Sequence, residues 1–233
     1  MAHHYDTRTR GKFSNSWLNS HHTFSFGEFH DPKRMGFRSL RVINEDHVAP
    51  AGGFGPHGHR DMEIVTYVLE GELAHKDSIG NGSVIRPSEI QRMSAGIGIR
   101  HSEMNASNKA QVHFLQIWIE PNKKGHAPSY EQVDLPTNVG KNGFTPIATQ
   151  QGSADAISLN QDVIISVSKP DANETIDVML DVGRYGFLHI VKGDVEIDNK
   201  TYHAGDGLAF DGTDVPFALT AQTASEILFF NLA

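Results

Sequence analysis

The chain has 233 residues, 28 acidic against 20 basic side chains, and a formal net charge of −8. This balance argues against a surface that binds nucleic acid or an anionic membrane. There is no cysteine, which excludes disulfides and thiolate ligands. No apolar run approaches the roughly 18 residues of a membrane-spanning helix, and the polar N-terminus lacks the apolar core of a signal peptide. We therefore expect a cytoplasmic protein.

Short strands joined by turns are predicted along the first half of the chain. Residues 13–45 alternate aromatic and polar positions and break at Asp31-Pro32. A glycine-rich loop at 51–56 leads into His57. Residues 63–69 are β-rich, and the strand that follows them runs into a turn at 77–82, which is typical of a hairpin.

The segment from Val112 to Ile119 is the strongest single strand pattern. Both of its faces are largely apolar, which predicts a central position in a sheet. Residues 121–136 are polar and contain prolines, and we expect them to cross between two halves of the chain. Helical periodicity is weak, and Glu131 to Val133 is one of the few plausible helix sites.

The two halves of the chain resemble each other. Residues 67–73 align with residues 189–195 at an offset of 122, and each stretch ends near a Gly-containing turn. The repeat indicates one β-barrel unit used twice. At the same offset His57 and His59 fall on Met179 and Asp181, so the second barrel is predicted to have no metal site.

Two short motifs carry candidate metal ligands: His57-Gly58-His59 and His101-Ser102-Glu103. Residues two apart on a strand share one face, so each motif directs two ligands the same way. Three imidazoles and a carboxylate form a mixed site that suits a divalent transition metal. Glu63 shares the strand parity of both histidines of the first motif, so it competes with Glu103 as the carboxylate ligand.

The other candidates carry less weight. His21-His22 is expected in a barrel wall or a surface turn, with an edge contribution to the cavity as the alternative. Lone strand histidines have structural roles by default; these are His75, His113 and His189. The glycines at 52–55 do not form a phosphate loop, because no Lys-Ser/Thr pair and no helix follow them.

Most of the first 130 residues resemble the pirin family of bicupins, within the cupin superfamily. The stretches that carry the resemblance are 17–20, 23–26, 57–63, 67–71, 93–103 and 116–119. The resemblance implies an all-β fold of two double-stranded β-helix (cupin, or jelly-roll) barrels. We expect an N-terminal metal-binding cupin barrel over residues 1–130 and a C-terminal cupin barrel without a metal site over residues 131–233.

The pirin pattern selects His57, His59, His101 and Glu103 as ligands of one divalent metal ion, with Glu103 also acting as the catalytic base. Glu63 is then either a neighbour that fixes a histidine tautomer or a surface charge. Fe(II) is the expected ion, although these ligands also accept Zn, Ni, Co, Mn or Cu. The loop at 96–98, Phe54 and Met93 are expected to line the cavity above the metal.

The resemblance implies a quercetin 2,3-dioxygenase-like oxidoreductase, which opens the heterocyclic ring of a flavonol such as quercetin and releases carbon monoxide. Its expected partners are a small aromatic substrate and dioxygen, with no direct nucleic-acid partner and no membrane. The alternative is a non-enzymatic metal-binding or redox-sensing regulator that acts through protein partners.

Overall fold

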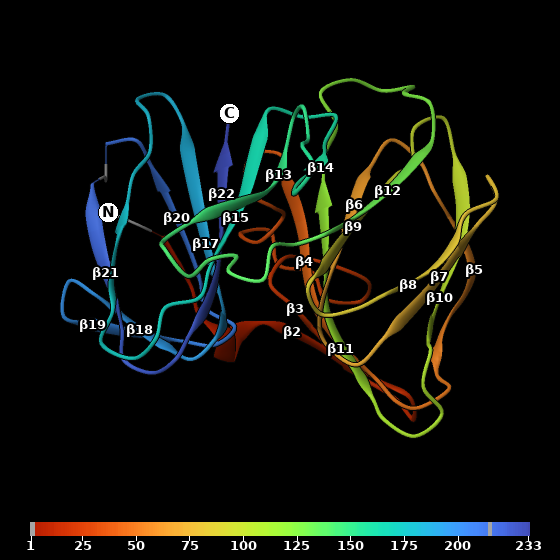
Figure 1. Cartoon of the computed structure of the whole chain (residues 1–233), viewed down its shortest axis with the longest axis horizontal. Coiled ribbons are helices and arrows are strands. Elements are labelled where there is room, and N and C mark those ends of the chain that lie inside the picture. The colour runs from red at the N-terminus through yellow and green to blue at the C-terminus, as the bar shows by residue number, and fades with distance from the viewer. Residues whose placement is uncertain (1–2, 214–215) are drawn as a thin grey trace. The chain divides into compact units, whose positions relative to one another are not determined.

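Nearly all regular structure in this protein is β-strand (Figure 1). The computed structural model describes residues 3–213 and 216–233. Within these ranges one short 3-10 helix, Thr7–Thr9, is the exception to the strands. The prediction of an all-β fold is confirmed.

The chain divides into two compact units that are not split at a single point. The N-terminal unit comprises residues 11–135 and 150–161. The C-terminal unit comprises residues 3–10, 136–149, 162–213 and 216–233. The first strand, β1 (His3–Tyr5), pairs with β20 (Gly207–Asp211) of the C-terminal unit. The expected domain boundary between residues 130 and 131 stays a prediction.

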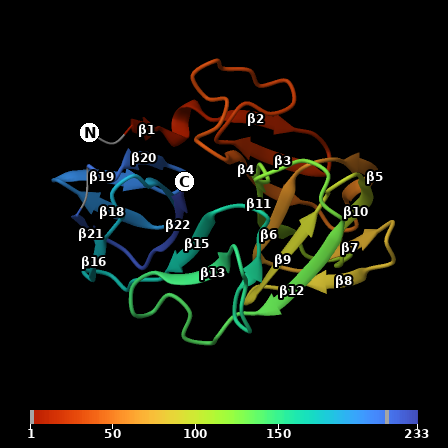
Figure 2. The same ribbon diagram turned by 90° about the horizontal axis from the view of Figure 1, so that it is seen from above.

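Two antiparallel sheets build the N-terminal unit. The longer sheet has the order β12-β9-β6-β11-β4-β3-β2, with β12 (Ser129–Asp134), β9 (Glu89–Ser94), β6 (Glu63–Glu70), β11 (Val112–Ile119), β4 (Leu40–Val48), β3 (Leu18–His22) and β2 (Gly11–Ser14). The shorter sheet has the order β5-β10-β7-β8, with β5 (Gly53–His59), β10 (Ile99–Asn105), β7 (Leu73–Asp77) and β8 (Gly82–Ile85). Figure 2 shows the shorter sheet on one side of the unit, across from β11, β6 and β9.

The apolar core of this unit takes side chains from both sheets. Leu18, Val48 and Phe114 come from the longer sheet and pack in one buried cluster with Leu73 and Ile85 of the shorter sheet. Burial of apolar side chains of this size stabilises the fold by about 1.5–3 kcal/mol each. Strand β11 lies between β4 and β6, so the prediction of a central strand at 112–119 is confirmed.

The helix expected at residues 131–133 is wrong. These residues lie in β12, which pairs antiparallel with β9, so the crossover segment is partly a strand. Glu131 stands opposite Arg92 in this register, and Arg92 Nη2 donates to Glu131 Oε2 at 2.9 Å. Ser158 of the short strand β14 (Ile157–Ser158) donates to the same carboxylate. Pairing with other segments of the unit therefore decides the local structure, as is common where intrinsic propensity is weak.

The C-terminal unit repeats this topology. One sheet has β1-β20-β17-β22-β15-β13, with β20 (Gly207–Asp211), β17 (Tyr185–Lys192), β22 (Glu226–Leu232), β15 (Val163–Ser168) and β13 (Thr145–Thr149). The other has β16-β21-β18-β19, with β16 (Thr175–Val178), β21 (Phe217–Ala221), β18 (Asp194–Ile197) and β19 (Lys200–His203). Strand β17 lies between β20 and β22 as β6 lies between β9 and β11.

The two turns that align in the sequence repeat have the same backbone form. Gly71 follows β6 with a φ of +77°, and Gly193 follows β17 with a φ of +81°. A Cβ at Gly71 would lie 2.6 Å from the Gln111 carbonyl oxygen, so a side chain is excluded by contact as well as by φ. The repeat at an offset of 122 is thus present in the structure.

Candidate metal centre

Three histidines meet on one face of the shorter sheet. His101 on β10 stands directly opposite His57 on β5, and His59 follows two residues along β5 on the same face. Their ring centroids are 4.4 Å (His57–His101), 4.8 Å (His57–His59) and 4.9 Å (His59–His101) apart. One ring nitrogen of each lies within 4.8 Å of the others, so the structure brings together the three imidazoles that the motifs predicted.

The hydrogen bonds of these rings suit a metal ligand set. His57 Nδ1 lies 2.9 Å from the Gly55 carbonyl oxygen, which orients the ring and leaves Nε2 available to bind a metal ion. His101 is buried, and neither of its ring nitrogens has a hydrogen-bond partner. A buried polar atom without a partner costs roughly 1–3 kcal/mol. A divalent ion coordinated by His101 would remove that cost for one of its two ring nitrogens.

Glu103 lies beside this triad in a second group. A register shift between His101 and Glu103 places Glu103 opposite Phe54 on β5 and opposite His75 on β7. Ligand atoms of His75, His101 and Glu103 lie within 4.8 Å of one another. The buried Glu103 accepts a hydrogen bond from Gln116 Nε2 at 3.4 Å. His101 belongs to both groups, so the Glu103 carboxylate lies beside the three histidines. The role of Glu103 as a metal ligand stays a prediction.

Burial sets the protonation states in this site. It lowers the pKa of His59 to about 4 and that of His101 to about 2, with the neighbouring His57 adding to both shifts. Burial raises the pKa of Glu103 to about 8, assisted by the nearby Asp46 carboxyl. Burial likewise raises the pKa of Asp46 to about 7. At neutral pH His59 and His101 are thus in the form that binds metal, whereas Glu103 holds a proton.

Glu63 has neither of the two roles that the sequence predicted for it, which were to fix a histidine tautomer and to lie on the surface as a charge. It is fully buried, so its interpretation as a surface charge is wrong. Its carboxylate accepts hydrogen bonds from Ser94 Oγ at 2.6 Å and Asn160 Nδ2 at 3.1 Å, in place of the expected imidazole. Glu63 does not share a strand face with His57 and His59, because the chain leaves the shorter sheet after His59 and enters the longer sheet at Glu63, through a turn at Asp61 with a φ of +49°.

A cavity of about 510 Å³ opens next to the histidines. Its lining combines aromatic side chains (Phe13, Phe26, Phe29, Phe54 and Trp118) with polar ones (Ser20, His22, Asn44, Asp46, Glu103 and Gln116). Phe54 lines the cavity as expected, and His22 makes the contribution that was the alternative for the His21-His22 pair. Met93 was expected in the lining but instead packs fully buried against Ile64, Ala95 and Ile99. The loop at 96–98 also lies outside the lining.

Sequence reasoning missed several residues of this site. His75 was assigned a structural role, although His75 and Asp77 repeat the two-residue spacing of the ligand motifs on one strand face. Their side chains lie 3.4 Å apart, from His75 Nε2 to Asp77 Oδ2. Asn44 and Asp46 alternate with outward-facing residues of β4, and that spacing was the signal for their shared cavity face.

Two family models match the chain. Residues 5–119 match the Pirin model, and residues 146–232 match the model of the quercetinase C-terminal cupin domain. The quercetin 2,3-dioxygenase of Escherichia coli K12 is 40% identical over 223 residues, which cover 96% of this chain and 95% of that protein. The chain belongs to the Pirin family. The resemblance of the sequence motifs to the pirin family is therefore confirmed.

Solved structures of Pirin family proteins match this member over its whole length. The crystal structure of YhhW from Escherichia coli superposes with a TM-score of 0.94 at 38% identity, covering 100% of this chain and 98% of that one. The nickel(II) complex of the bacterial pirin YhhW gives a TM-score of 0.92, again at 38% identity, covering 100% and 99%. Both matches confirm the bicupin fold. Within the described residues, no helix is long and apolar enough to cross a membrane.

Proposed function

We propose that this Pirin family member is a metal-dependent dioxygenase that opens the heterocyclic ring of a flavonol such as quercetin and releases carbon monoxide. One observation carries the proposal: a buried imidazole without hydrogen-bond partners meets two further imidazoles beside a cavity with an aromatic lining. The name and 40% identity of the Escherichia coli relative support an oxidoreductase of the dioxygenase type.

The proposed ligands are His57, His59, His101 and Glu103, all on neighbouring strands of one sheet. A bound divalent ion supplies Lewis acidity and the redox chemistry that lets dioxygen react with the substrate. These four side chains would hold the ion, which would supply its chemistry to a substrate oxygen and to dioxygen in the adjoining cavity. Fe(II) is our first choice, and the nickel complex of the related YhhW makes Ni(II) an ion to test.

Glu103 is the proposed proton acceptor. The reaction requires the enolic hydroxyl of the flavonol to lose its proton, and a carboxylate within reach of that oxygen can take it. Burial raises the pKa of Glu103 to about 8 before a metal binds, and a bound divalent ion would displace that proton and leave the carboxylate that this step requires. Gln116 Nε2 donates to its Oε1 and holds the carboxyl in place.

The cavity matches a flat, hydroxylated aromatic molecule. Aromatic side chains supply faces on which fused rings can lie, and the volume of about 510 Å³ falls in the range of small-molecule sites. The polar lining carries two buried acceptors without a hydrogen-bond partner, Asn44 Oδ1 and Asp46 Oδ1. Hydroxyl groups on the substrate rings would donate to them.

The proposal is tested by following the visible absorption band of quercetin. The protein should bleach the band in air and leave it unbleached without oxygen. Removal of the metal should stop the bleaching, and addition of a divalent ion should restore it. A spectral shift without oxygen uptake would indicate chelation alone and favour the non-enzymatic regulator.

A further inference from the structure

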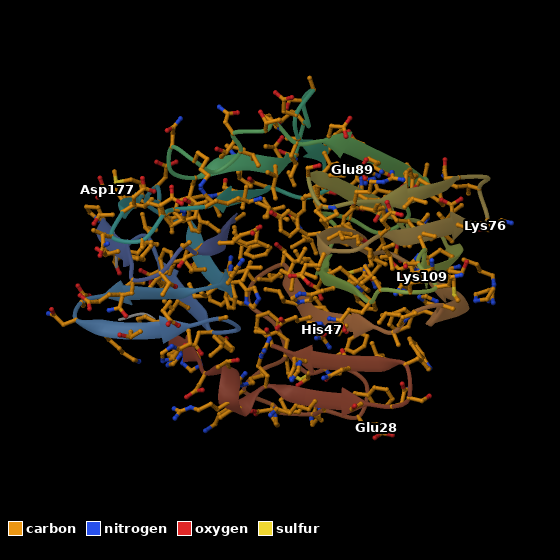
Figure 3. The ribbon with its side chains drawn as sticks, turned by 60° about the horizontal axis from the view of Figure 1, so that its bottom comes forward. Glu28, His47, Lys76, Glu89, Lys109 and Asp177 are labelled. Atoms are coloured by element: carbon orange, nitrogen blue, oxygen red, sulfur yellow. The ribbon has the colours of Figure 1, made fainter. Side chains whose placement is uncertain are left out.

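Two neighbouring strands of the longer sheet, β4 and β11, carry a second group of histidine and carboxylate side chains on their other face. Along β4, Asn44 and Asp46 line the cavity, so Glu45 and His47 point to the opposite side of the sheet. On the neighbouring β11, His113 stands directly opposite His47 in the antiparallel register. His47 is labelled in Figure 3.

These three side chains are in contact. The rings of His47 and His113 are stacked, with centroids 3.8 Å apart and planes inclined by 16°. Glu45 Oε1 lies 3.0 Å from His113 Nε2 and 3.9 Å from His47 Nε2. One ligand atom from each of the three residues lies within 4.8 Å of the others. The geometry thus gathers two imidazoles around one carboxylate oxygen.

The surroundings favour a cation. His47 is 30% exposed, and Glu45 and His113 are 17% and 16% exposed, so an ion can reach the cluster and keep water ligands. Glu70 stands opposite His113 on β6 and adds a second carboxylate nearby. His21 stands opposite Glu45 on β3 and brings a third imidazole to the same face. All of these positions lie on paired strands, which limits the backbone rearrangement needed on binding.

We propose that Glu45, His47 and His113 form a second divalent transition-metal site, weaker than the central one, on the face of β4 and β11 opposite the cavity. Two imidazole nitrogens and one carboxylate oxygen suit Zn²⁺, Ni²⁺ or Cu²⁺ and disfavour Mg²⁺ and Ca²⁺, which prefer oxygen ligands. Stacked parallel rings cannot both aim a lone pair at one ion, so binding requires a rotation of the imidazoles. That rotation and the three-ligand set make the site the weaker of the two.

Titration of the metal-stripped full chain with Ni²⁺ tests the proposal. The wild type should bind a tight and a weaker equivalent. The double variant His47→Gln/His113→Gln should bind the tight equivalent alone and keep its full activity on quercetin. His203→Gln is the matched control, because His203 is an exposed histidine whose ring lies 2.8 Å from the carboxylate of Asp194. This control should bind both equivalents.

Two further measurements keep the test independent of folding and of the proposed dioxygenase. Glu45→Gln retains both imidazoles and should weaken only the second equivalent, by roughly tenfold. His101→Ala should lose the tight equivalent and keep the weaker one. One equivalent in the wild type would overturn the proposal. So would a second equivalent that survives unchanged in both the double variant and Glu45→Gln.

Discussion

Glu103 and His75 stand directly opposite each other on the antiparallel strands β10 and β7, and both side chains are buried. The ring of His75 lies 5.3 Å from that of His101, centroid to centroid, and its Nε2 is 3.4 Å from Asp77 Oδ2. His75 therefore connects an acidic side chain of β7 to the proposed ligands of β10.

His75→Ala should weaken metal binding by roughly 10- to 100-fold, because a residue that supports ligands typically contributes that much. Metal affinity of the purified variant measures the effect. His189→Ala is the control, since His189 is an equally buried strand histidine of the C-terminal unit. Equal losses in both variants would assign the effect to general destabilisation and contradict the role of His75.

The two glutamates should separate into a functional and a structural residue. Glu103→Ala should abolish turnover of quercetin, because it removes the proposed ligand and base. Glu63→Ala should keep measurable turnover but unfold more easily, since it leaves the buried Ser94 hydroxyl without its acceptor and removes one of the two acceptors of the Asn160 side-chain amide. Such a loss costs about 1–3 kcal/mol in the free energy of unfolding.

Activity and urea denaturation of both glutamate variants measure this separation. A Glu63→Ala protein without turnover, beside an active Glu103→Ala protein, would show that the carboxylate was assigned to the wrong residue.

Metal affinity should rise with pH up to about 8 and then level off. Burial, and then Asp46, raise the pKa of Glu103 to about 8, so ligation at pH 7 must release its proton. His59 and His101 have pKa values lowered to about 4 and about 2, so near neutral pH these two rings have no proton to release.

Calorimetric titrations in buffers of different ionisation enthalpy count the released protons. Near pH 7 we expect close to one proton per metal ion, and in Glu103→Gln close to none. A variant that keeps the same pH dependence would contradict the assignment of this proton to Glu103.

Individual strands could be predicted from the sequence, whereas the strands with which they pair could not. The alternation at 112–119 identified a central strand correctly, because both faces of that strand are buried. The three histidines were found because each motif lies on one strand and parity holds along a strand. Parity failed for Glu63, where the chain changes sheets at Asp61. The helix expected at 131–133 failed because pairing with β9 is a long-range interaction that no local pattern encodes.

The roles of His75 and of the polar cavity lining could not be predicted from the sequence for a related reason. A buried histidine in a strand has a structural role by default, and the approach of His75 to Glu103 depends on the β7–β10 pairing and its register. The place of Asn44 in the cavity lining likewise depends on the pairing of β4 with β11, where Gln116 stands opposite Asn44 on the same cavity face.

Asn44→Leu should raise the KM for quercetin by roughly tenfold, which corresponds to one lost hydrogen bond of about 1.4 kcal/mol. Leucine has a similar volume but cannot accept a hydroxyl donor. The KM for 3-hydroxyflavone, which lacks the additional ring hydroxyls, should change little. Steady-state kinetics with both substrates make the comparison, and an equal rise for both would show that Asn44 shapes the cavity without recognising hydroxyls.

Simultaneous measurement of oxygen uptake and carbon monoxide release during quercetin turnover tests the central claim most directly. We expect the metal-loaded wild type to release one carbon monoxide per dioxygen consumed, and the His101→Ala variant to exchange neither gas. Oxygen uptake without carbon monoxide, or equal gas exchange by His101→Ala, would contradict a metal-dependent flavonol dioxygenase at this site.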